Sequence, residues 1–110
     1  MTTTYTDADR AFLRELADAL DAMPERRLIP YALHGDEGVC ALGCLVLRRG
    51  IDMSAIYLFP GSHTLSNLLG ATRLIVQEVS NVNDRGGHKT PPELRWKRVR
   101  TWVAKQLAAS

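Results

Sequence analysis

The longest uninterrupted apolar run in the chain is residues 39–47 (VCALGCLVL), which follows the turn-like segment 34–38 and ends before Arg48. All nine positions are apolar, so neither face suits water, and such a segment is buried as a helix or as a strand. We favour a helix, because only two of the nine residues are β-branched, arginines suit a helix C-terminus and Gly50 suits the position after it. Gly43 costs about 1 kcal/mol of helix propensity relative to alanine, which a closely crossing helix would explain.

Four further segments carry apolar residues at the spacing of one helix face, which predicts amphipathic helices packed around the buried one. Thr6 and Asp9 resemble a capping box before the first helix, and Pro24 ends it. The segment 90–93 (TPPE) opens the last helix with a capping box and a proline at the first helical position. Asp52 is expected to cap a single turn. The predicted helices are residues 7–23, 62–70, 71–83 and the segment from 90 onward.

The pattern leaves two conformations open for residues 24–38. In one, residues 28–33 are extended and turn at residues 35–38 into a small hairpin with Val39, and Pro30 confines that strand to an edge. In the other, the stretch is an ordered loop. Either way the chain predicts an all-α fold: a single compact domain of four to six short helices around a buried apolar helix, with at most one minor β-hairpin.

A length of 110 residues agrees with one domain and one core over residues 1–110. Residues 1–5 are expected to form a flexible tail, and the aromatic segment at residues 57–61 to break the helix and pack against the core.

Charge is distributed unevenly, although the formal net charge is only +2 and gives no global field that would favour nucleic acid or membranes. Residues 1–25 carry six acids against two arginines, whereas residues 85–110 carry seven bases against one glutamate. In one interpretation this asymmetry marks an interaction surface. In the other, the two ends are complementary helices that face each other.

Residues 1–6 lack the basic region of a signal peptide, and the longest apolar run is far short of the ~20 residues that span a bilayer. Cys40 and Cys44 lie inside the buried run, where free cysteines behave as small hydrophobic side chains. We therefore expect a cytoplasmic protein in a reducing compartment, with no membrane association.

Residues 65–79 (LSNLLGATRLIVQEV) resemble the helix-turn-helix of DNA-binding proteins, with Gly70 at the turn and Thr72 capping the second helix. Leu74 departs from the pattern, because a DNA-reading helix offers polar side chains on its outer face. A glycine corner is also common in plain helical hairpins, so that alternative stays open. A surplus apolar face at Leu74 would also suit a homodimer. The nucleic-acid-binding residues of this hypothesis are Arg73, Gln77 and Asn81.

The last helix is the second candidate for a binding surface. Basic side chains surround Trp96, which lies off the apolar stripe that includes Leu94, and an exposed tryptophan among arginines could anchor a protein partner or stack on a base. The alternative is a solvated basic face with Trp96 covering a neighbouring loop. The predicted partner-binding residues are Arg95, Trp96, Arg98, Arg100 and Lys105.

Catalytic and metal-binding patterns find little support in the sequence. The three histidines fall in turns and share no recognisable spacing with a nucleophile, and the neighbours of Cys40 bury its thiol. Cys40, Cys44 and His34 match no familiar zinc spacing. We predict no enzyme activity, no catalytic residue, no metal site and no cofactor, and we expect Asn83 and Asp84 to cap backbone groups of the loop they precede.

Three segments, VCALG at 39–43, the Asn83-Asp84 pair and TPPELRWKRVRTWV at 90–103, together resemble a group of small uncharacterised proteins encoded in phages and prophages. Residues 23–30 (MPERRLIP) fit as well, so the resemblance spans most of the chain. It implies a phage-type accessory protein acting inside a bacterial cell. It implies no activity, because the shared residues are mostly helix caps and core positions.

These features together predict a non-enzymatic accessory protein that binds a bacterial protein and blocks it through a charged helical surface. The blocked protein is a host protein or a host-defence protein. The alternative is a small helix-turn-helix regulator that binds DNA through residues 65–81. This alternative predicts steeply salt-dependent DNA binding, because neutralised phosphates release counterions.

Overall fold

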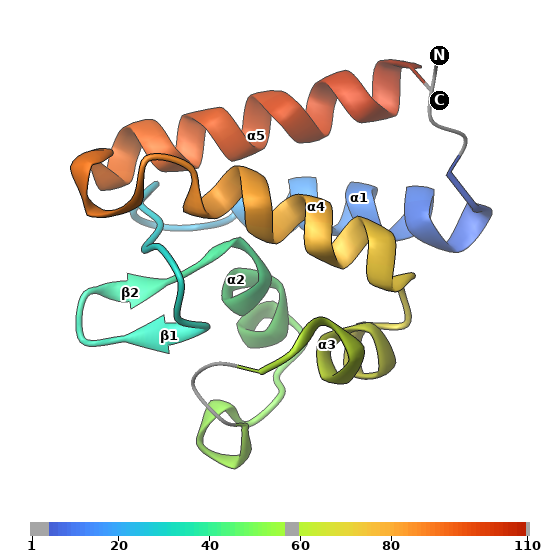
Figure 1. Cartoon of the computed structure of the whole chain (residues 1–110), viewed down its shortest axis with the longest axis horizontal. Helices are drawn as coiled ribbons and strands as arrows, with labels where there is room; N and C mark the ends of the chain where they lie inside the picture. Colours follow the sequence, from blue (N-terminus) through green and yellow to red (C-terminus); the bar gives the residue numbers. More distant parts are fainter. Residues whose placement is uncertain (1–4, 57–59, 110) are drawn as a thin grey trace.

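The computed structural model describes residues 5–56 and 60–109. The described residues form an all-α domain with one small hairpin, as the sequence predicts (Figure 1). The elements in chain order are α1 (Asp7–Asp21), β1 (His34–Gly35), β2 (Gly38–Val39), α2 (Ala41–Arg48), the 3-10 turn η1 (Met53–Ala55), α3 (Ser62–Leu69), α4 (Arg73–Asp84), the 3-10 turn η2 (Gly87–Lys89) and α5 (Pro92–Ala109).

Helix α2 is the buried helix against which α1 and α4 pack. It contacts α1 and α4, while α5 lies along α1 and α4 at the top of Figure 1, and α3 packs on α4. The positions 41–46 of α2 are all buried. The predicted buried helix over residues 39–47 is therefore confirmed for residues 41–46 and wrong at its ends. Val39 belongs to β2, Cys40 is the N-cap residue, and Leu47 is 59% exposed.

Gly43 faces a backbone carbonyl rather than a crossing helix. A Cβ built at this position would lie 2.1 Å from the Leu33 carbonyl oxygen. The same carbonyl accepts a hydrogen bond from the Cys40 N–H at 3.1 Å, so the Leu33 peptide rests directly on the first turn of α2. The glycine is needed because the loop that enters the hairpin passes too close for any side chain.

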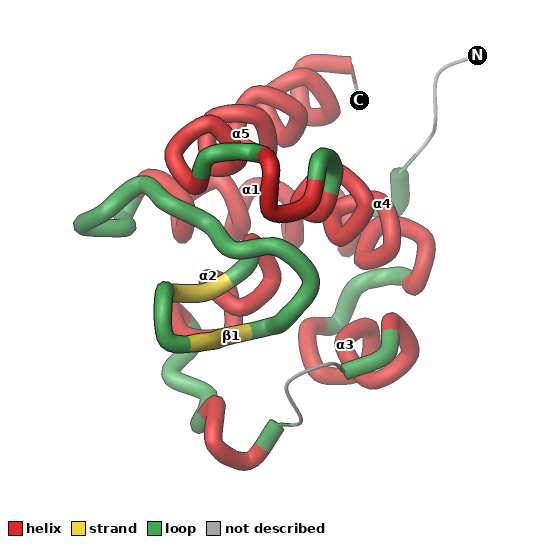
Figure 2. The backbone as a smooth tube through the Cα atoms, turned by 60° about the vertical axis from the view of Figure 1, so that its left-hand side comes forward, coloured by secondary structure: helices red, strands yellow, loops and turns green. Residues whose placement is uncertain are grey.

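The hairpin predicted as one of two alternatives is present, but it is shorter than expected. Its two strands pair antiparallel, with His34 opposite Val39 and Gly35 opposite Gly38. The Ile29 N–H donates to the Val39 carbonyl at 3.0 Å, which ties the preceding loop to the outer side of β2, and Pro30 lies outside both strands. Figure 2 shows the hairpin and the loop that leads into it on one side of the helices.

The caps at α1 and at the α3–α4 corner agree with the sequence. The Thr6 hydroxyl accepts from the Asp9 N–H at 3.0 Å, and the Thr72 hydroxyl accepts from the Ile75 N–H at 3.3 Å. Gly70 ends α3 in the left-handed conformation, with φ at 69°. The Asp9 carboxylate, however, does not return to its own helix, because it accepts from the Thr72 N–H and hydroxyl at 3.0 and 2.8 Å.

Two smaller expectations concern the starts of η1 and α5. Asp52 caps η1 as predicted, accepting from the Ser54 N–H at 2.9 Å. Helix α5 begins at Pro92, so a proline does hold its first position. The expected capping box at Thr90 is wrong, because the helix starts one residue later than that box requires and the Thr90 hydroxyl donates to the Arg85 carbonyl. The expected packing of the aromatic segment falls on residues 57–59, which lie outside the described residues.

Tyr5 is not part of a flexible tail. Its side chain is buried, and its hydroxyl lies 2.9 Å from Glu78 Oε2 and 3.0 Å from Gln106 Oε1. Burial and the neighbouring Glu78 raise the pKa of Tyr5 to about 12. An aromatic ring that buries its surface between α4 and α5 is held in place even though it precedes the first helix.

We expect Gly43→Ala to lower the free energy of unfolding by about 2 kcal/mol, because overpacking against a backbone carbonyl outweighs the gain in helix propensity. Urea denaturation measures the change. The matched control is Gly61→Ala, where a Cβ meets nothing within 4 Å and φ is −70°, and the expected change is below about 1 kcal/mol. An unchanged or raised stability of Gly43→Ala would contradict the close approach.

Candidate functional site

Arg95, predicted as a surface contact, lies in the interior and is 1% exposed. Its Nη1 atom donates to the Asn83 and Arg85 carbonyls, and its Nη2 atom to the Gly87 and Thr90 carbonyls. These acceptors belong to the C-terminal end of α4 and the loop after it, where free carbonyls attract a cation. Burial lowers the pKa of Arg95, but a guanidinium stays charged. The prediction of a contact residue is wrong, because Arg95 holds this loop from behind.

Trp96 is also buried, with 8% of its surface exposed, so the prediction of an exposed anchor is wrong. Its Nε1 atom donates to the Leu20 carbonyl at 3.1 Å, and the Arg26 guanidinium lies 4.7 Å from the centre of its ring. The indole therefore closes the C-terminal end of α1. It does cover a neighbouring segment, as the alternative interpretation held, but that segment follows α1.

Arg100 belongs to the contact between α1 and α5. Its Nε and Nη2 atoms donate to the two Asp21 oxygens at 2.8 and 3.0 Å, which lowers the pKa of Asp21. Glu15 of α1 is likewise bound by Arg49, at 2.7 Å. Part of the charge asymmetry along the sequence is therefore explained by complementary elements that face each other within the fold.

The remaining predicted residues, Arg98 and Lys105, lie on a groove between the C-terminal end of α4 and the outer side of α5. We call it the basic groove; its volume is about 280 Å³. Four of its residues are cationic, and Leu94 and Trp102 supply apolar surface. Its lining residues are Val82, Arg85, Leu94, Lys97, Arg98, Thr101, Trp102 and Lys105.

Leu94 was expected on the buried stripe of α5, yet it is 50% exposed. The helix is turned so that Arg95, Val99 and Val103, each four residues apart, face the core. Leu94 precedes this stripe by one position, so it falls on the groove side. The sequence analysis did not place Leu94, Lys97 and Trp102 on one surface. Their spacing along α5 indicates a shared face only when Arg95 is taken to point into the core.

Arg95 also positions the rim of the basic groove. The Arg85 carbonyl accepts from Arg98 Nη1 at 2.7 Å and lies 3.5 Å from Arg95 Nη1. A Cβ at Gly86 would lie 2.1 Å from the Thr90 hydroxyl oxygen, so the loop after α4 is tightly folded around these donors. The buried guanidinium thus holds Arg85 beside the basic face of α5.

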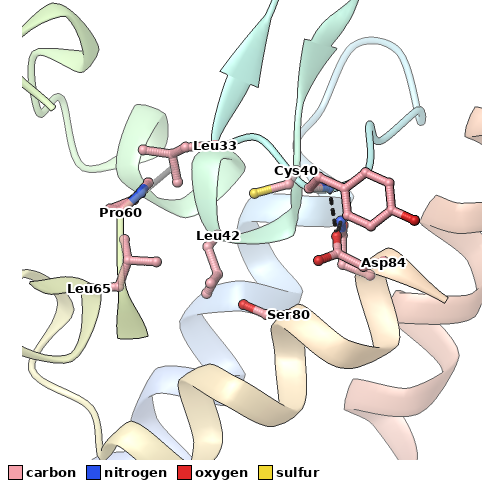
Figure 3. A pocket seen from close by; sticks show the side chains of 9 residues that line it. Leu33, Cys40, Leu42, Pro60, Leu65, Ser80 and Asp84 are labelled. Atoms are coloured by element: carbon pink, nitrogen blue, oxygen red, sulfur yellow. Dashed lines mark hydrogen bonds between the residues drawn. The ribbon is translucent and has the colours of Figure 1, made fainter. Parts of the chain in front are cut away.

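A second, smaller cavity of about 50 Å³ lies at Cys40 (Figure 3). Leu42 and Leu65 line one part of it, and Ser80 and Asp84 approach from α4. Burial raises the pKa of the Cys40 thiol to about 11, and that of Cys44 also to about 11. A thiol with such a pKa is almost fully protonated at neutral pH and is a poor nucleophile.

The polar groups beside this cavity serve the fold. Asp84 Oδ1 accepts from the Tyr31 N–H at 2.7 Å, and Asn83 Oδ1 accepts from the Ala41 N–H at 3.0 Å. The Asn83 amide donates to the Ile29 carbonyl at 2.9 Å. The expectation that the two residues cap the loop that follows α4 is therefore wrong: the backbone groups that they bind belong to α2 and to the loop at residues 29–31.

The outer face of α4 carries the residues of the helix-turn-helix hypothesis. Arg73, Gln77 and Asn81 are all exposed, and Gln77 Nε2 donates to Asn81 Oδ1 at 3.0 Å. Leu74 beside them is 59% exposed. Arg73 is the one cation of the three, so this face is far less basic than the groove.

Among residues 5–56 and 60–109, no three His, Cys, Asp or Glu side chains are grouped closely enough to hold a metal ion. No helix in the same residues is both long enough and apolar enough to cross a membrane.

The fold and the groove define a small helical protein with one strongly cationic surface. Comparisons with protein-family models, with curated proteins and with solved structures found no match to this chain.

We expect Arg95→Met to lower the free energy of unfolding by about 3 kcal/mol, because it leaves several buried carbonyls without a donor. Urea denaturation of Arg100→Met is the matched control, since that residue forms an exposed ion pair worth about 0–1 kcal/mol. Equal losses in the two variants would show that the Arg95 guanidinium does not hold the loop.

Proposed function

We propose that this chain is a non-enzymatic accessory protein, of the phage-encoded type that its sequence resembles, which binds a bacterial protein through the basic groove and blocks it. The observation that carries the proposal is the groove itself. Its cations are Arg85, Lys97, Arg98 and Lys105, and among the described residues none of the four forms an ion pair.

The mixture of charge and apolar surface favours a protein as the bound molecule. Protein interfaces combine an apolar and aromatic centre, often with arginine, and a polar rim. Leu94 and Trp102 supply such a centre, and the four cations supply the rim. Covering a complementary surface on a target protein needs no chemical step. This agrees with an accessory protein that acts by occupying its target.

The side chains that could serve catalysis are engaged or kept apart. The two thiols have a raised pKa, and the Asp84 oxygen Oδ1 accepts two hydrogen bonds. His63 lies 3.3 Å from the Asn67 amide on α3, whereas His88 packs edge-on against Tyr31, with 5.6 Å between the ring centres. These positions support binding over nucleophilic chemistry.

A pull-down from bacterial lysate treated with nuclease tests the proposal. We expect the purified chain to retain a partner protein, and Lys97→Glu/Lys105→Glu to retain at most about a tenth as much, because like charges at an interface are strongly unfavourable. The control is Arg14→Glu/Arg48→Glu, which reverses two exposed charges outside the groove.

Equal retention by the groove variant and the control would contradict the assignment of the contact surface. A partner recovered only while nucleic acid is intact would contradict a direct protein target and would favour the second function below.

The second candidate is a small DNA-binding regulator that uses residues 65–81. The observation in its favour is the corner itself: Gly70 ends α3 in the left-handed conformation, Thr72 caps α4, and Arg73, Gln77 and Asn81 are exposed together on the second helix. A recognition helix needs polar side chains of this kind on its outer face.

If this function holds, the logarithm of the DNA association constant will fall linearly with the logarithm of salt concentration. Arg73→Ala will weaken binding and reduce the slope by about 1, the contribution of one phosphate contact. Arg14→Ala, outside this face, is the control in the same fluorescence titration. DNA binding that is indifferent to salt would rule the function out.

A further inference from the structure

We propose that the occupant of the basic groove is an acidic amphipathic helix of a partner protein, with carboxylates on either side of an apolar stripe. This inference rests on the proposed function and names the chemistry of its target.

The charge of the groove is not balanced from within the described chain. Its cations come from both of the segments that line it: Arg85 follows α4, and Lys97, Arg98 and Lys105 lie on α5. None of the described residues that line it is acidic. The complementary charge must come from the bound molecule, so that molecule is acidic.

Two acids on α1 and α5 already have partners outside the groove. Glu93, at the start of α5, pairs with Arg27 at 3.3 Å. Asp21, on the neighbouring α1, pairs with Arg100. These two acids are therefore bound by basic residues outside the groove and do not neutralise its cations.

The apolar surface of the groove separates an acidic protein from a nucleic acid. Leu94 is half exposed and Trp102 is partly buried, and both line the groove together with Val82. Covering Leu94 with an apolar side chain removes its surface from water, whereas a phosphate backbone offers nothing that would do so. A partner that brings both carboxylates and an apolar side chain satisfies both features.

The geometry favours a helix over an extended segment. Two helices wall the groove, and it offers side chains rather than the free backbone edge that an added strand would need. Along α5 the lining residues Leu94, Lys97, Arg98, Thr101 and Lys105 follow the spacing i, i+3, i+4, i+7 and i+11 of one helix face. They cover about 17 Å of helix axis, which matches about three turns of a helix packed alongside.

The test uses purified chain and fluorescent synthetic helices, with binding measured by anisotropy. The probe peptide carries leucines at i, i+3, i+4 and i+7 between glutamates. One matched peptide replaces the leucines by alanine, another replaces the glutamates by glutamine, and duplex DNA serves as a polyanion without apolar groups. We expect the probe to bind at least about tenfold more tightly than each of the others.

The variants locate the binding on the groove. Leu94→Ala and Lys97→Glu/Lys105→Glu should each weaken binding of the probe, the second by at least about tenfold, while Arg14→Glu/Arg48→Glu should bind it as the unmodified chain does. Leu94 is half exposed, so its truncation leaves the core packing in place.

Three outcomes would overturn the inference. Equal binding of the probe and its alanine counterpart, or tighter binding of DNA, would make the groove a site for polyanions. If no peptide binds, while retention of the lysate partner still depends on Lys97 and Lys105, the assignment of a helix as the bound segment is wrong and the proposed function stands. Conversely, specific peptide binding without any lysate partner would support the inference and count against the blocking function.

Discussion

The buried guanidinium of Arg95 fixes how α5 is rotated, and the surface of the molecule depends on that rotation. A charged group at 1% exposure is tolerated only where acceptors surround it, and the end of α4 with its following loop provides four carbonyls. Once Arg95 faces inward, Val99 and Val103 follow it into the core, and Leu94 and Lys97 turn outward. The basic groove on the surface therefore depends on the hydrogen bonds that the buried Arg95 guanidinium needs.

The same principle joins other elements that lie far apart in the sequence. The Asp9 carboxylate of α1 binds the N-cap residue Thr72 of α4, and Asn83 of α4 binds backbone groups of Ile29 and Ala41. In each case a polar side chain on one helix satisfies backbone groups that another element leaves unpaired at its end. Apolar packing brings the helices together, while these few polar contacts decide their relative positions.

Local patterns in the sequence were sufficient to predict α2, the caps at Thr6 and Thr72, and the corner at Gly70, because each depends on neighbouring residues. The ends of helices were less accurate: α1 was expected to reach residue 23 but ends at Asp21. The largest errors concern Arg95 and Trp96, which look like surface residues when charge and the stripe of α5 are considered alone. Their partners lie on other elements, as with the Leu20 carbonyl, and no periodicity within α5 reveals them.

The position of α5 has a consequence for how the chain folds during synthesis. Helix α1, made first, is covered by α5, made last, and Trp96 closes on Leu20 across 76 positions of sequence. Until α5 has left the ribosome, the part of α1 that α5 covers stays exposed, and the carbonyls at the end of α4 have no guanidinium. Contacts of such long range slow folding and leave apolar surface exposed in the growing chain. Helix α5, which carries most of the groove, therefore also completes the core. The cationic surface forms only when the whole domain has folded.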